Sequence, residues 1–395
     1  DLDELNINVE QMESFVLENP KSISAIGLKH QNLKAKSEKI RSEQLKKSVS
    51  QKPPTKDLDI DIEDLDFAHL HVFSQFSVLQ STVHIKKLVD KVGKLKMPAI
   101  ALTDLGNMMA AFRFERVVSN YNKEIRKNNE LEDAEKKQEI LPIIGCTYNI
   151  CADRLNKSVK DNGYQVVLLA KNKSGYQNLI KLASIAYTEG FYYVPRIDKS
   201  AIEQYHKDII VLSGNMNGEI PGLILKVGET QAEESLIWWK NLFGDDFYIE
   251  INRHQLEFEQ RVNDSLISLA RKHNVKLIGA NSVYYLNQDD SESHDVLLCV
   301  KENELVSKPK GRGRGFRYGL ENDSYYLKSK QEMQELFSDL PEAIANISEV
   351  IGKCEHYPLQ RDVLLPEFSI PDQFIDSNDE KDGGKRGENN YLKHL

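Results

Sequence analysis

The chain has 395 residues, enough for two or three average domains or for one α/β barrel with additions, and it can bury a sizeable core. Its net charge of -9 at pH 7 argues against a surface that is basic throughout, so any nucleic-acid binding must come from a local cluster of lysines and arginines. Four cysteines without a CxxC pair indicate neither a disulfide framework nor a zinc knuckle, and no membrane span or signal peptide is visible. We therefore expect a cytoplasmic protein without a membrane partner.

The first 65 residues differ from the rest and are predicted to be an extension. Residues 1–18 carry six acids and no lysine or arginine, and their apolar side chains follow one helical face, with Leu5, Val9, Met12 and Val16 at the repeat. Residues 29–56 are polar and basic, which is typical of a solvated helix or linker. We place a domain boundary near residue 65. Because the chain begins with an aspartate, we also expect it to be part of a longer protein.

From Phe67 onward a short apolar run is repeatedly followed by a longer segment with helical spacing. The runs are "FAHLHVF" (67–73), "PAIALTD" (98–104), "LPIIGCTYNIC" (141–151), "YQVVLLAK" (164–171), "DIIVLSG" (208–214), "FYIEI" (247–251) and "VKLIGAN" (275–281). About seven such units predict parallel strands with helical crossovers, hence an α/β fold of the distorted (β/α)7 barrel type. In such a barrel the functional site lies at the carboxyl ends of the strands.

Two stretches interrupt this repeat. Residues 122–139 are almost all charged or amide and are predicted to be an exposed insertion. Residues 307–319, "SKPKGRGRGFRYG", combine glycines with five cations, Lys308, Lys310, Arg312, Arg314 and Arg317. These cations could follow a DNA backbone, although loops of this kind are often only solvated. The GxG spacing is not a dinucleotide fingerprint, because no strand leads into it.

Several polar residues stand directly after the predicted strands. They are His69, His71, Asp104, Thr147, Asn215, His254, Asn281 and Ser282. A multinuclear metal centre needs several imidazoles and several carboxylates, and this set has three histidines and one carboxylate. A single weakly held ion on His71, Asp104 and His254 is the alternative to a hydrogen-bonded scaffold, and His69 is better explained as a satisfied core histidine. No GxSxG, Walker A or HExxH motif is present.

Read together, phrases along the chain resemble the PHP domain of the bacterial replicative DNA polymerases of the polymerase III α type. They include "FAHLHVFSQFSVL", "MPAIALTDLGN", "LLAKNKSGYQNLIKLAS", "GFYYVPRID", "SESHDVLLCVK" and "LPEAIANISEV", and they run in the family's order from residue 66 to about residue 367. The terminal "GGKRGENNYLKHL" looks like the lead-in to a polymerase palm domain. The resemblance implies a PHP barrel at 66–300, a basic loop and helical end at 301–367 and the lead-in at 368–395.

The same resemblance implies that most metal-ligand positions of the family have changed. His71 takes the place of the first ligand and Asp104 that of the aspartate in a TDH motif, and His254 matches a histidine of related sequences. The other ligand positions hold Phe73, Gln80, Leu105, Thr147, Gln165, Asn215, Ser282 and Tyr284. Intact members are credited with metal-dependent 3′-5′ exonuclease or phosphoesterase activity, which would need zinc or manganese here.

We therefore expect an inactive structural and interaction module, with no cofactor of its own, in a DNA-directed DNA polymerase whose magnesium-binding catalytic carboxylates lie outside this chain. The expected partners are the polymerase core of the same chain, a proofreading exonuclease, other replisome subunits and DNA. The alternative is a metal-dependent phosphoesterase that uses His71, Asp104 and His254.

Overall fold

The computed structural model describes most of the chain. The described residues are 65–131, 136–311, 313–360, 370–375 and 386–395. By its contacts the chain divides into two units, Asp1–Asp59 and Ile60–Leu395. The helical face expected within residues 1–18 lies outside the described residues, and so does the basic linker.

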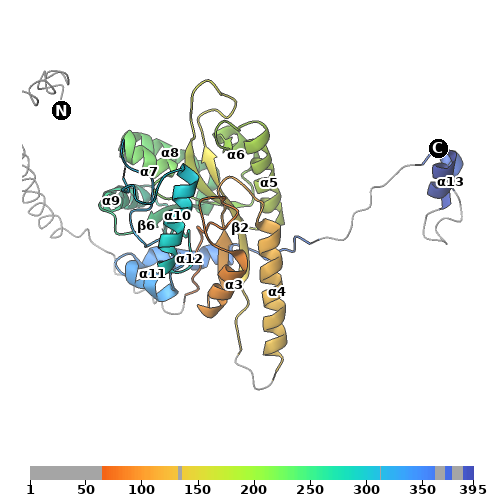
Figure 1. Ribbon diagram of the computed structural model, residues 1–395, viewed down its shortest axis with the longest axis horizontal. Helices are drawn as coiled ribbons and strands as arrows, with labels where there is room; N and C mark the ends of the chain where they lie inside the picture. Colours follow the sequence, from red (N-terminus) through yellow and green to blue (C-terminus); the bar gives the residue numbers. More distant parts are fainter. Residues whose placement is uncertain (1–64, 132–135, 312, 361–369, 376–385) are drawn as a thin grey trace, which may run out of the picture. The chain divides into compact units, whose positions relative to one another are not determined.

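The described part of the second unit is built around one seven-stranded sheet (Figure 1). The strands are β1 (Ala99–Leu102), β2 (Leu141–Ile150), β3 (Tyr164–Ala170), β4 (Arg196–Ile197), β5 (Ile209–Leu212), β6 (Phe247–Asn252) and β7 (Lys276–Ala280). Their order is β1-β2-β3-β5-β6-β7, and β4 pairs with β2. The strands are almost wholly buried, as expected for a sheet covered by helices.

The prediction that all strands are parallel is wrong for β3. This strand runs antiparallel to both of its neighbours, β2 and β5, whereas the pairs β1–β2, β5–β6 and β6–β7 are parallel. A parallel pair needs a crossover of a dozen or more residues, usually a helix. Residues 151–163 between β2 and β3 contain no helix and return the chain directly, so the two strands form a hairpin.

Residues 67–73 close the sheet into a distorted barrel, although they do not form the regular first strand that we expected. On one side the Ala101 amide donates to the His69 carbonyl at 3.0 Å, and on the other the Phe73 amide donates to the Val283 carbonyl at 3.0 Å. Val72 and Val283 form an isolated parallel bridge. The ladder toward β1 is interrupted because the Val72 amide donates to the Thr103 hydroxyl at 2.9 Å instead of to a carbonyl.

Helices cover the outside of the sheet, with α4 and α5 on one side in Figure 1 and α7, α8 and α9 on the other. The helices are α3 (Ile85–Lys94), α4 (Ala111–Asn129), α5 (Lys173–Thr188), α6 (Lys199–Tyr205), α7 (Glu219–Lys226), α8 (Glu229–Phe243), α9 (Glu257–Lys272), α10 (Ser291–Glu302), α11 (Lys330–Leu336), α12 (Pro341–Gly352) and α13 (Arg386–His394). Short 3-10 turns occupy Gly244–Asp246, Gln288–Asp290 and Asp372–Phe374. Among the described residues no helix is long and apolar enough to cross a membrane.

Helix α4 corrects the predicted insertion at 122–139. The helix continues to Asn129, so the first eight residues of that stretch are helical. Asn122 and Ile125 are buried on the face that also carries Val118. The Asn122 side chain donates to the Ile140 carbonyl at 2.8 Å and accepts from the Ile140 amide at 2.9 Å, which ties the helix to the start of β2. An amide that satisfies two backbone groups is stable at a buried position, and composition alone does not reveal this.

Candidate functional site

The carboxyl ends of the parallel strands meet at one mouth of the barrel, where a buried histidine is hydrogen-bonded to a buried glutamate. His71 and Glu250 are both completely buried, and His71 Nδ1 donates to Glu250 Oε1 at 2.9 Å. The His71 Nε2 atom lies 3.4 Å from the Thr147 hydroxyl, which itself donates to the Thr103 carbonyl at 2.9 Å. Glu250 stands on β6 in "FYIEI", and the sequence analysis did not include it in the site.

From Glu250 the hydrogen bonds continue across the mouth through neutral side chains. Asn252 Nδ2 donates to Glu250 Oε1 at 2.8 Å, and the Ser282 hydroxyl donates to Asn252 Oδ1 at 3.4 Å. Asn215 Nδ2 then donates to Ser282 Oγ at 3.0 Å. Together with His71 and Thr147 these residues form one buried network, which we call the mouth network.

Asp104 lies after β1 but is committed to a neighbouring loop. Its carboxylate accepts from the Ser74 amide, the Ser74 hydroxyl and the Ser77 hydroxyl, each at 2.7 Å. Burial raises the pKa of Asp104, while these hydrogen bonds from Ser77 and Ser74 oppose the rise. The carboxylate thus holds the turn at residues 74–77.

His254 is oriented by a carboxylate that the sequence analysis also missed. Its Nδ1 donates to Glu259 Oε1 at 2.7 Å, and its amide donates to Glu259 Oε2 at 2.7 Å. The ring stacks on Tyr325, with centroids 4.0 Å apart. Its Nε2 is buried without a hydrogen-bond partner, as is Oε2 of Glu250. Glu259 is the third residue of α9, and its spacing from His254 could have suggested the contact.

An aromatic pair fills part of the same mouth. Phe73 and Tyr284 stack with ring centroids 4.6 Å apart and planes 7° from parallel, and His71 packs against Phe73 at 4.9 Å. Leu105 forms a parallel bridge with Thr147. Apolar contact thus occupies the space beside the mouth network.

Two further residues of the predicted set lie apart from the network. His69 Nε2 donates to the Lys328 carbonyl at 2.8 Å, and burial lowers the pKa of His69 to about 4. Asn281 Nδ2 donates to the Tyr326 carbonyl at 2.7 Å. Both side chains connect the barrel to residues 326–328. Over the described residues, no group of three or more histidine, cysteine, aspartate or glutamate side chains is placed to hold a metal ion.

Comparison with known proteins identifies the family. Residues 69–254 match the PHP domain family. The DNA polymerase III subunit alpha of Borreliella burgdorferi is 37% identical over 334 residues, covering 83% of this chain and 26% of that protein. The subunit of Treponema pallidum is 33% identical over 336 residues, covering 84% and 26%. This chain carries a PHP domain of the polymerase III α type. It spans about a quarter of the length of these curated relatives.

Solved structures of related fold align weakly with this PHP domain. A two-domain protein from Bacteroides vulgatus that contains a predicted PHP-like metal-dependent phosphoesterase is 14% identical, covers 65% of this chain and 60% of its own, and has a TM-score of 0.33. A likeness at this score carries no argument about the site.

Within the PHP domain, positions that resemble the family's metal ligands bond to one another. His71, Thr147, Asn215 and Ser282 all belong to the mouth network, and Phe73 and Tyr284 stack together. Asp104 and His254, which the sequence analysis grouped with His71, are each held by a separate set of partners. His71, Asp104 and His254 thus belong to three separate sets of hydrogen bonds.

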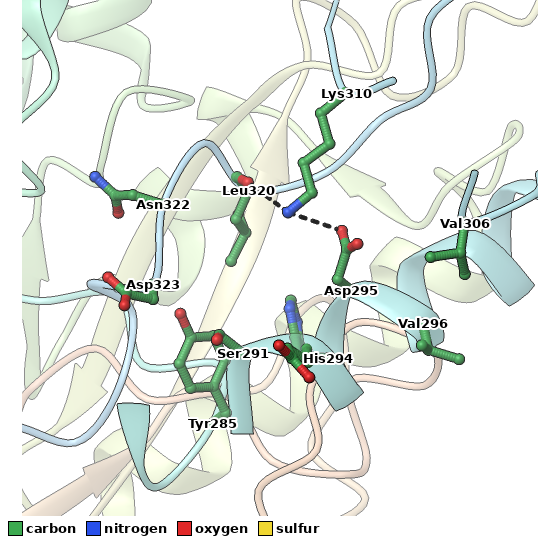
Figure 2. Close-up of a pocket in the computed structure, with 11 residues that line it drawn as sticks. Tyr285, Ser291, His294, Asp295, Val296, Val306, Lys310, Leu320, Asn322 and Asp323 are labelled. Atoms are coloured by element: carbon green, nitrogen blue, oxygen red, sulfur yellow. Dashed lines mark hydrogen bonds and ion pairs between the residues drawn. The ribbon is translucent and has the colours of Figure 1, made fainter. Parts of the chain in front are cut away.

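The basic loop of the PHP domain lies beside α10 and is largely paired within the protein. Arg317 is 5% exposed, and its guanidinium binds both oxygens of Asp295 at 2.9 and 2.6 Å. Figure 2 shows Lys310 reaching the same carboxylate, at 3.2 Å. Lys308 pairs with Glu304 at 2.7 Å. Arg314 is exposed between two glycines, and Arg312 lies outside the described residues.

A pocket of about 440 Å³ opens between α10 and this loop. Figure 2 shows Asp295 and Asp323 on opposite sides of it, with Ser291 and His294 between them. His294 is not free, because its Nε2 donates to the Gln80 carbonyl at 2.8 Å and burial lowers its pKa. Acidic walls of this kind do not favour a phosphate ligand.

Proposed function

We propose that this PHP domain is a structural and interaction module of a DNA-directed DNA polymerase, with a metal site that has degenerated. The mouth network is the observation that supports this proposal most directly. Hydrogen-bonding groups at the resembling ligand positions are turned toward one another, and only one of these positions in the network, His71, carries an imidazole. Asn215, Ser282 and Thr147 offer neutral oxygens, which compensate no cationic charge.

The donor set therefore does not fit a multinuclear centre. Such a centre stabilises four or more positive charges with several carboxylates. At this mouth the Glu250 carboxylate accepts hydrogen bonds from His71 and Asn252 through one oxygen, and Asp104 is saturated by two serines.

A single weakly held ion on His71, Asp104 and His254 is the second candidate. Of these three side chains, His254 keeps a buried atom without a hydrogen-bond partner, Nε2, an imidazole nitrogen of the kind that zinc and manganese accept. This candidate keeps the metal-dependent 3′-5′ exonuclease as the alternative function.

Metal analysis of the purified chain separates the two candidates. The proposal expects no stoichiometric zinc or manganese, a melting temperature that EDTA leaves unchanged, and no release of nucleotides from labelled single-stranded DNA in the presence of manganese. About one ion per chain, together with nucleotide release that EDTA stops, would establish the exonuclease instead.

A Glu250→Gln variant tests whether the hydrogen bond between His71 and Glu250, and not a metal ion, stabilises the barrel mouth. Leaving a buried hydrogen-bonding group without its proper partner typically costs about 1 to 3 kcal/mol. We expect a loss of this order in the free energy of unfolding, measured in urea and equal with and without EDTA. Glu139→Gln, which breaks an exposed pair with Arg126, is the control and should leave stability nearly unchanged. A Glu250→Gln loss that appears only in the presence of metal would contradict the proposal.

Contact with DNA through residues 308–317 is part of the proposal, and Arg314 is the described cation that is best presented. Lys308, Lys310 and Arg317 already have carboxylate partners. We expect Arg314→Ala to weaken duplex DNA binding and to reduce the slope of log K against log salt by about 1, and Lys308→Ala to have a smaller effect. Unchanged binding and slope for Arg314→Ala would make the segment a surface loop. We also propose that the chain docks to the polymerase core and to a proofreading exonuclease, because it is similar to DNA polymerase III subunit alpha.

A further inference from the structure

A second surface lies at the end of the β2–β3 hairpin, built from two loops that the function above does not use. One loop is residues 151–163, between β2 and β3, and the other is residues 189–195, between α5 and β4. β4 pairs in parallel with the end of β2, with Ile150 opposite Ile197, which brings the two loops together.

A single buried arginine fixes both loops. Arg196 is 0% exposed, and its guanidinium donates to four backbone carbonyls and to no carboxylate. Nε donates to the Gly190 carbonyl at 2.9 Å, and Nη1 donates to the Asp161 carbonyl at 2.7 Å. Nη2 reaches the carbonyls of Arg154 and Asn156 at 3.3 and 3.2 Å. A planar fork with this many fixed partners holds the loops rigidly before any ligand binds.

These fixed loops and the adjoining end of α5 expose apolar and aromatic side chains. The loops carry Leu155 at 62%, Val159 at 65%, Phe191 at 48% and Tyr193 at 63%, and α5 carries Tyr187 at 43%, stacked on Phe191 with ring centroids 6.3 Å apart. We call these five residues the hairpin platform. Tyr193 has φ +62°, a left-handed conformation that a bulky residue rarely adopts. Tyr193 thus combines a strained backbone with an exposed ring, and strained backbone of this kind is often found at binding sites.

The charges around the platform balance in number, with four carboxylates and four cations, but they differ in availability. The four carboxylates are engaged within the protein: Asp153 caps the Leu155 amide, Asp161 binds the amides of Ala152 and Gly163, and Glu189 and Asp198 bind Arg154. Lys157 and Lys160 are exposed, and neither has a carboxylate partner among the described residues. The Lys160 ammonium lies 4.8 Å from the centroid of the Tyr193 ring, on one face of it.

We infer that the hairpin platform binds single-stranded nucleic acid, with bases stacked on Tyr193 and Phe191 and phosphates beside Lys157 and Lys160. Exposed aromatic rings beside two lysines that have no carboxylate partner among the described residues match the two features of a single strand, an unpaired π-face and a regular negative backbone. Lys160 takes one face of Tyr193, so a base would stack on the other face or on Phe191. A duplex fits less well, because its bases are already stacked and present no free face.

The platform borders the barrel mouth. Pro195 follows the aromatic segment, and its ring lies where a Cβ on Gly106 would have to fit, two residues after Asp104. Asn149 Nδ2 at the end of β2 donates to the Pro195 carbonyl at 3.1 Å. A strand held on the platform would therefore pass along the rim of the mouth. This site is separate from residues 308–317 and does not depend on their role.

The test compares two fluorescent probes of equal length, an oligothymidylate and an oligomer of abasic sites, by anisotropy with the whole chain. The abasic probe has the phosphates without the bases. We expect the oligothymidylate to bind on the order of tenfold more tightly than the abasic probe. The double variant Phe191→Ala and Tyr193→Ala should lose that preference, whereas Tyr193→Phe should keep it because its ring remains.

The charge component has its own variants. Replacing Lys157 and Lys160 with alanine should reduce the salt slope for both probes by about 1.4, since each single-strand phosphate contact contributes about 0.7. Leu131→Ala removes another exposed apolar side chain, just after α4, and should change nothing. Equal wild-type affinity for the two probes, or a double alanine variant with the wild-type preference, would overturn the inference. If the wild type binds neither probe and the double alanine variant loses self-association, the platform is a protein interface instead.

Discussion

His69 is a histidine whose environment allows only its neutral form near pH 7. Its Nε2–H donates to the Lys328 carbonyl, its Nδ1 has no partner, and burial lowers its pKa from 6.5 to about 4. Between these two values the unfolded chain binds a proton that the folded protein does not bind, so stability falls as the pH is lowered from about 6.5 to about 4. A core histidine was the prediction for this position, and residues distant in sequence supply its hydrogen bond.

The pH dependence can be measured with a His69→Gln variant, whose amide can still donate to Lys328. Between pH 7 and pH 4 the free energy of unfolding, measured in urea, should fall by about 3 kcal/mol more in the wild type than in the variant. His206→Gln changes a partly exposed histidine and serves as the control. A parallel pH dependence of wild type and His69→Gln would show that His69 is protonated in the folded protein.

At the scale of elements, the contact between α10 and the basic loop shows how one carboxylate can order a glycine-rich segment. Asp295 on α10 binds Arg317, which also donates through Nε to the Lys308 carbonyl at 2.8 Å. The Gly311 amide donates to the Arg317 carbonyl at 3.0 Å, and Lys310 and Arg317 form an isolated parallel bridge that closes the loop around Arg314. Five cations close together in the sequence suggested one continuous phosphate-binding strip, but three of them are paired with two carboxylates, Glu304 and Asp295. Sequence could not reveal this, because Asp295 lies 22 residues from Arg317.

This anchoring predicts a local change in Asp295→Ala. Without its partner the buried guanidinium loses two charge-assisted hydrogen bonds, and we expect the amides of residues 310–317 to exchange hydrogen much faster while the barrel strands remain protected. Glu304→Ala removes the more exposed partner of Lys308 and should leave the exchange of residues 310–317 nearly unchanged. Equal exchange in the two variants would mean that Asp295 does not order the loop.

At the scale of the whole molecule, all four cysteines report on the integrity of the barrel. Each is buried and free, Cys146 on β2, Cys151 after it, Cys299 on α10 and Cys354 after α12. Burial raises the pKa of Cys146 and Cys151 and raises that of Cys354 to about 12, so their reactive thiolate forms are scarce near neutral pH. We expect the native protein to show almost no reaction with Ellman's reagent and the protein in denaturant to show four thiols. Fast labelling of native protein would indicate that the barrel opens locally.

The repeat of strands and helices could be predicted from the sequence, because the spacing of apolar side chains is a local property. The segments predicted around α3, α9 and α10 and the buried strand β6 are confirmed on this basis. It also contained the family resemblance, which the comparisons confirm. The residue types at the mouth were only partly readable, since the carboxylates of Glu250 and Glu259, which bind His71 and His254, were missed.

Which of these residues form hydrogen bonds with one another depends on the tertiary structure. His71 and Glu250 are 179 residues apart and pair inside the barrel, and Asn215 and Ser282 are 67 apart and share a hydrogen bond. The direction of β3 and the burial of Arg317 depend in the same way on chain closure rather than on local pattern. A hydrogen bond requires its two groups within about 3 Å, and only the packing of the whole barrel brings distant residues to that distance.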